Sequence, residues 1–98
     1  MKVIIIKFNQ KGKKIWTKSF DSIHNYSFFK KLSNNYTLFI GVSTNSNERI
    51  VFKLNEHGQI IWEKEINLDY VTDIEINNHQ YIITGKKNDK KQSIILED

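Results

Sequence analysis

The two tryptophans and three histidines of this chain are the first candidates for chemistry. Trp16 and Trp62 could serve as flat platforms against which a sugar ring stacks, because an indole offers a large apolar face with one polar edge. Histidine binds metals or transfers protons only beside a suitably placed partner. Because His24, His57 and His79 have no such neighbour in the sequence, we expect all three to be surface residues.

Three acidic residues, Asp69, Asp73 and Glu75, form a further candidate cluster. Their separations are even numbers, so on a β-strand all three side chains would lie on one side of the sheet. We expect that side to be solvated. The sequence thus predicts no catalytic residue, no metal site and no cofactor, and we expect the chain not to be an enzyme.

Composition bounds the class of protein. The 98 residues contain 39% hydrophobic side chains and no cysteine, which is typical of a small folding domain without disulfides. The net charge of +4 comes from scattered lysines that fall mostly beside expected turns, so nucleic-acid binding is not favoured. The apolar run in MKVIIIKF is too short for a signal-peptide core, and no segment is long enough to cross a membrane. A cytoplasmic location is the default expectation.

The strongest signal is an internal repeat. IIIKFNQKGKKIWTKSF (residues 4–20) and IVFKLNEHGQIIWEKEI (residues 50–66) share seven of seventeen residues at an offset of 46, including both tryptophans. The segments 34–54 and 77–98 also match, at an offset of 44, which aligns Gly41 with Gly85. The period is therefore about 45 residues. We divide the single domain, residues 1–98, into copies at about 4–49 and 50–93, with a third partial copy at 94–98.

Each repeat is expected to consist of four β-strands. QIIWEKEI alternates with period two, and VIIIKF and IVFKL are apolar on both sides, as in strands covered on both faces. Hairpins are predicted to join residues 3–8 to 14–20, 36–42 to 49–54, and 50–54 to 60–66. One further strand is expected in each of DSIHNYSFFKKLSNN and DYVTDIEINNH, although a helix over the first is the main local alternative. The predicted fold class is all-β, with antiparallel four-stranded units.

Turns and core follow from the same pattern. We predict structural turn roles for four glycines, with positive φ at the first two and with Asn9 and Asn55 bonding back to the turn backbone: Gly12, Gly58, Gly41 and Gly85. Because Trp16 and Trp62 recur at one repeat position, packing is favoured over a ligand platform. The predicted buried residues are Trp16, Trp62, Ile4, Ile6, Phe52, Phe39, Ile83 and Ile95.

Four-stranded units of 40 to 50 residues are typical of β-propeller blades. The segment KLNEHGQIIWEKEI…VTDIEINNHQYIITGKKN resembles bacterial β-propeller repeats of the pattern KLD-x-x-G-x-x-x-W…GG-Y-x-x-x-G, which are related to quinoprotein-type blades. The residues that carry this resemblance are Lys53, Leu54, Asn55, Gly58, Trp62, Tyr81 and Gly85, and, in the first copy, Lys7, Phe8, Asn9, Gly12, Trp16, Tyr36 and Gly41. The resemblance implies about two propeller blades.

The resemblance implies a scaffold more than an activity, since one fold hosts many functions. We expect a non-catalytic module that binds protein or assembles with itself, because open strand edges recruit other strands. Two alternatives remain open: a carbohydrate-binding lectin assembled from two-blade subunits, and a remnant of a quinoprotein-like enzyme. Since VIIIKFN and SIILED are copies of one strand, they would compete for one place in a closed ring. This favours a piece of a longer propeller over a ring subunit.

Overall fold

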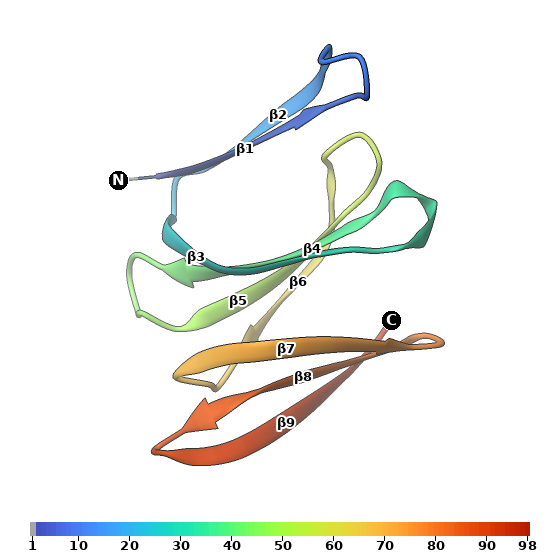
Figure 1. Ribbon diagram of the computed structural model, residues 1–98. Coiled ribbons are helices and arrows are strands. Elements are labelled where there is room, and N and C mark those ends of the chain that lie inside the picture. Colours follow the sequence, from blue (N-terminus) through green and yellow to red (C-terminus); the bar gives the residue numbers. More distant parts are fainter. Residues whose placement is uncertain (1) are drawn as a thin grey trace.

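The regular secondary structure of residues 2–98 is antiparallel β-sheet, apart from one short 3₁₀ turn at Ser33–Asn35 (Figure 1). The computed structural model describes residues 2–98, and in this part of the chain there are nine strands: β1 (Val3–Phe8), β2 (Lys14–Phe20), β3 (Ile23–Lys31), β4 (Thr37–Ser43), β5 (Arg49–Leu54), β6 (Ile60–Ile66), β7 (Tyr70–Asn77), β8 (Gln80–Lys87) and β9 (Lys90–Glu97). The all-β prediction is therefore confirmed, and the segment with a helical alternative forms β3.

The strands form three sheets that stack on one another, as Figure 1 shows. The first sheet contains β1 and β2, the second contains β3 to β6, and the third contains β7 to β9. Every strand pairs only with its neighbours in sequence. The three predicted hairpins are confirmed as β1–β2, β4–β5 and β5–β6. The three sheets have two, four and three strands, and residues 2–98 form no closed ring.

The repeat is visible in the geometry of the hairpins. Both β1–β2 and β5–β6 carry a bulge at the same repeat position, between Lys7 and Phe8 in one and between Lys53 and Leu54 in the other. In both turns an asparagine side chain closes the loop. The Asn9 carboxamide oxygen accepts backbone N–H bonds from Lys11 and Lys13 at 2.9 Å, and Asn55 does the same for His57 and Gln59.

Two hydrophobic layers hold the stack together, one on each side of the second sheet. Toward the first sheet, Phe39 and Phe52 pack with Phe20, their ring centroids 4.9 to 5.7 Å apart. Toward the third sheet, the layer contains the buried side chains Leu38, Ile40, Val51, Ile74, Tyr81 and Ile83, among others. The second sheet is thus apolar on both sides because it is covered on both sides.

The expected core was right for the middle of the stack and wrong for its ends. Phe39, Phe52 and Ile83 are buried, with at most 3% exposure. Three other predicted core residues are exposed: Ile4, Ile6 and Ile95, at 52%, 49% and 58%. They lie on the outward sides of β1 and β9, which no further sheet covers. The repeat predicts that these positions are apolar, but they are buried only where another sheet packs against them.

Two predicted turn glycines lie within strands instead. Gly41 is inside β4 and Gly85 is inside β8. A Cβ atom at Gly41 would come within 2.6 Å of the Ile23 side chain, and one at Gly85 within 2.0 Å of the Tyr70 carbonyl oxygen. Both glycines are therefore required by the close approach of the preceding strand, and neither has a positive φ.

Candidate functional site

A partly buried ion pair joins the second sheet to the end of the third. Lys53, near the end of β5, is 9% exposed, and its Nζ atom donates a hydrogen bond to Oδ2 of Asp98 at 2.5 Å. Lys53 points to this side because the alternation along β5 places it with Val51, on the face covered by the third sheet. Asp98 follows β9 directly, and its backbone N–H donates to the His79 carbonyl.

Aromatic side chains surround this pair. The Trp62 indole N–H donates to Oδ1 of Asp98, and the Tyr81 hydroxyl donates to Oδ2, both at 2.9 Å. The ammonium of Lys53 lies 5.4 Å from the ring centroid of Tyr36 and 5.6 Å from that of Tyr81. Such distances allow cation–π attraction. The carboxylate is thus bonded by three donors, and the ammonium lies between two rings.

The hydrogen-bond partners in this cluster set the protonation states of its side chains. Burial alone would raise the pKa of Asp98, but the hydrogen bonds from Lys53, Trp62 and Tyr81 outweigh it and lower that pKa to about 2. Burial alone would lower the pKa of Lys53, yet its bonds with Asp98 and Tyr81 raise it overall. Burial raises the pKa of Tyr81. At neutral pH the cluster contains an ammonium, a carboxylate and a neutral phenol.

This protonation pattern decides what the cluster can do. A lysine that acts as a nucleophile or base needs a pKa lowered toward neutrality. The pKa of Lys53 moves the other way, so its lone pair is not available. The arrangement favours a structural role, in which the pair ties β5 to the end of β9.

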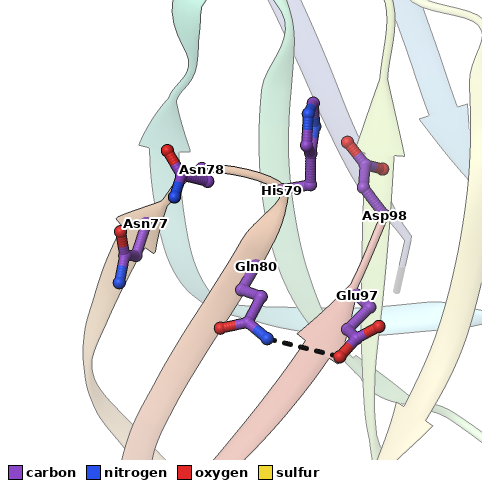
Figure 2. A pocket seen from close by; sticks show the side chains of 6 residues that line it. All are labelled: Asn77, Asn78, His79, Gln80, Glu97 and Asp98. Carbon is purple, nitrogen blue, oxygen red and sulfur yellow. Dashed lines mark hydrogen bonds between the residues drawn. The ribbon is translucent and has the colours of Figure 1, made fainter.

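Two shallow depressions flank this cluster. The first has a volume of 390 Å³, and Figure 2 shows its lining side chains: Asn77, Asn78, His79, Gln80, Glu97 and Asp98. Two of these side chains bond each other: Gln80 donates to Glu97 at 3.3 Å, drawn as a dashed line. The second, of 300 Å³, is lined partly by Tyr36, Lys53 and Tyr81. Among residues 2–98 no group of three or more histidine or acidic side chains is placed to hold a metal ion.

The two tryptophans lie between sheets. Trp16 is half-buried, and its indole ring lies against Gly58 in the turn of the next repeat, while its N–H donates to the Glu56 carbonyl at 2.9 Å. Trp62 is also half-buried, packs beside Tyr81 and bonds Asp98. Both indoles therefore use their polar edge and part of their apolar face within the chain. This geometry is that of packing residues.

The predicted turn glycines Gly12 and Gly58 have φ values of +81° and +80° in equivalent turns. Their surroundings differ. Gly58 is buried, and a Cβ atom there would come within 2.7 Å of the Trp16 ring. Gly12 is exposed, and a Cβ atom there would have no neighbour within 4 Å. One glycine is thus covered by an indole, and the other has open space.

The remaining candidate residues, the histidines and the acidic side chains, do not lie together at one site. His57 and His79 are exposed and His24 is partly buried, on three different elements. Asp69 precedes β7 and accepts bonds from the Asn88 backbone N–H and from Lys87, which lower its pKa. It therefore closes the β8–β9 turn and lies outside the strand that carries Asp73 and Glu75. All three acidic residues are exposed, as expected.

Sequence reasoning missed the Lys53–Asp98 pair. Lys53 was assigned to the repeat pattern, where Lys7 is its equivalent, and gave no sign of burial. The available signal was at the other end: the repeat places Asp98 where the second copy has Leu54. A charged residue at a position that is apolar in another copy marks a local departure from the repeat.

An uncovered apolar surface lies at the other end of the stack. Ile4, Ile6 and Phe8 alternate with inward-facing Val3 and Ile5 along β1, and Ile15 lies on the same outward side of β2. We call Ile4, Ile6, Phe8 and Ile15 the end face. Each of the four is about half exposed, between 49% and 56%. Phe52 and Leu54, the repeat equivalents of Ile6 and Phe8, are exposed by only 3% and 0%, whereas Ile61, the equivalent of Ile15, is 48% exposed.

No protein-family model, no curated protein and no solved structure matches this chain. In residues 2–98 there is also no helix with the length and apolar character needed to span a bilayer. The site is therefore interpreted from its own geometry.

Proposed function

We propose that the chain is a non-catalytic module of β-propeller type that acts as a protein-interaction or assembly scaffold. In this interpretation the second sheet is a complete four-stranded blade, and the first and third sheets are parts of two further blades. The antiparallel sheets, their order along the chain and their face-to-face stacking support this assignment.

The observation that carries the proposal is the end face. Ile6 and Phe8 are about half exposed, whereas their repeat equivalents Phe52 and Leu54 are buried. Contiguous apolar surface of this kind marks interaction sites on soluble proteins. The end face is therefore suited to contact with another protein surface, and the burial of Phe52 and Leu54 beneath the first sheet supports a β-sheet as that surface.

Sedimentation velocity tests the proposal directly. We expect the isolated chain to self-associate as its concentration rises from low micromolar to near millimolar, because exposed end faces bury one another. Ile6→Lys places a charge in the middle of the end face and should greatly weaken this association. Ile61→Lys is the matched control, since Ile61 has nearly the same exposure, 48%, but lies on β6.

The proposal would be wrong if the chain stayed monomeric over the whole range and melted cooperatively. It would also be wrong if Ile6→Lys and Ile61→Lys changed association equally, since the end face would then have no special part in it.

A further inference from the structure

The chain contains two sheet-to-sheet interfaces, and both place a tryptophan in the same way. At the first, Trp16 of β2 reaches across to the β5–β6 turn and donates to the Glu56 carbonyl. At the second, Trp62 of β6 reaches across to the third sheet and donates to Asp98. In each case the last strand of one sheet contributes an indole to the sheet that follows it.

The Trp16 contact has a shape that only glycine permits. The ring lies so close to Gly58 that any Cβ would overlap three ring carbons, at 2.7, 2.9 and 3.1 Å. Residues 55–59 form the turn, held by Asn55. The turn therefore combines a flat, uncovered backbone at Gly58 with a carbonyl acceptor at Glu56, which together accept an indole.

The turn at residues 9–13 has the same features without an indole. Asn9 holds it by the same two bonds, Gly12 has the same φ as Gly58, and Gln10 takes the place of Glu56. The space above Gly12 is open, and the end face lies beside this turn just as Phe52 and Leu54 lie beside the other. The Gly12 turn and the end face thus repeat the surface around Gly58, which Trp16 covers.

We propose that the end face and the Gly12 turn form a docking site for a further β-sheet of this repeat that carries a tryptophan on its last strand. The indole would stack on Gly12 and donate to the Gln10 carbonyl, and its sheet would cover Ile4, Ile6 and Phe8. This inference rests on the proposed function, since it names the partner of the same surface.

A second copy of this chain fits the site less well. The surface that it could offer in the matching orientation is the outward side of the third sheet, where Ile82 and Ile95 form the only apolar cross-strand pair among the described residues. The rest of that side is polar: Thr84 bonds Ser93, and Gln80 bonds Glu97. Because the third sheet ends at β9, it also offers no tryptophan strand.

An extended chain tests the inference. Residues 3–48 are added ahead of residues 3–98, so that the added segment ends where β5 would begin and continues into β1, its repeat equivalent. The added copy of Trp16 then faces Gly12 as Trp16 faces Gly58. The readouts are melting temperature and tryptophan fluorescence.

In the natural chain, Gly12→Ala should lower the melting temperature by roughly 4–8 °C, because only the left-handed φ is strained. Gly58→Ala should lower it about twice as far, since the new Cβ also displaces Trp16. In the extended chain the loss for Gly12→Ala should rise to match that for Gly58→Ala. Replacing the added tryptophan by alanine should return it to the smaller value.

Two results would overturn the inference. One is an extended chain that melts no higher than the natural chain, since a covered apolar face must raise stability. The other is a Gly12→Ala loss that is the same with and without the added segment. Neither depends on self-association of the natural chain, so a failure here is distinct from a failure of the proposed function, which shows in the sedimentation of the natural chain and of its Ile6→Lys and Ile61→Lys variants.

Discussion

The Asp98 carboxylate shows how one residue can distinguish two otherwise equivalent interfaces. Its repeat equivalent, Leu54, is fully buried among phenylalanine rings. Asp98 instead accepts bonds from Lys53, Trp62 and Tyr81. An exchange of leucine for aspartate is tolerated only where donors are already present, because an unpaired carboxylate between sheets would cost several kcal/mol. The second interface is therefore partly electrostatic, while the first is apolar.

The free energy of unfolding should accordingly decrease at acidic pH. The pKa of Asp98 is about 2 in the folded protein, below its ordinary value of 3.8, so its contribution is complete above about pH 4 and is lost as the pH falls toward 2. With solvent screening this contribution is roughly 1–2 kcal/mol. Urea midpoints measured between about pH 5 and pH 2 should fall more steeply for the natural chain than for Asp98→Asn.

Equal slopes for the two proteins would show that the Asp98 carboxylate is not stabilised by folding. Lys53 behaves in the opposite sense. Its pKa is raised, so its contribution is complete at neutral pH and should be lost only as the pH rises through the raised, strongly alkaline pKa.

At the residue scale, the turn conformations could be predicted from the sequence, whereas the contacts between strands could not. The positive φ of Gly12 and Gly58 and the side-chain bonds of Asn9 and Asn55 follow from turn chemistry within five residues. The roles of Gly41 and Gly85 depend on β3 and β7, whose approach no local pattern reveals.

At the scale of elements, alternation located the strands but not their cover. VIIIKF and RIVFKL have the same apolar pattern, yet the outward side of β1 is exposed and both sides of β5 are buried. The apolar pattern indicates which residues are compatible with burial. Which strands are buried is decided by the number of sheets in the stack, and the ends differ from the middle.

Gly85 offers a test of strand-to-strand contact within the third sheet. A bulge between Val71 and Asp73 brings the Tyr70 carbonyl over Gly85, and an added Cβ would lie 2.0 Å from that oxygen. Since backbone must move, Gly85→Ala should destabilise by about 3 kcal/mol or more. The exposed neighbour Lys86→Ala is the control and should stay within about 0.5 kcal/mol. Similar urea midpoints for both variants would contradict the placement of the bulge.

At the scale of the whole molecule, the repeat was the informative signal. It predicted an all-β chain built from four-stranded units, and the antiparallel sheets contain two, four and three strands. The repeat does not predict whether the sheets close into a ring, because closure depends on whether another sheet covers the end face. The physical content of the repeat lies in its interfaces, since sheets of this type stack through an apolar side and an indole.

The exclusive pairing of each strand with its neighbours in sequence has a consequence for folding kinetics. Every hairpin closes over a short loop, so contact order is low for an all-β protein and folding should be fast for its class. Protection against amide hydrogen exchange should be graded in the same way: highest in β4 and β5, which are paired on both edges and covered on both faces, and lowest in β1 and β9. Exchange measured by NMR at each amide would show this gradient, and uniform protection from β1 to β9 would mean that the three sheets open as one unit.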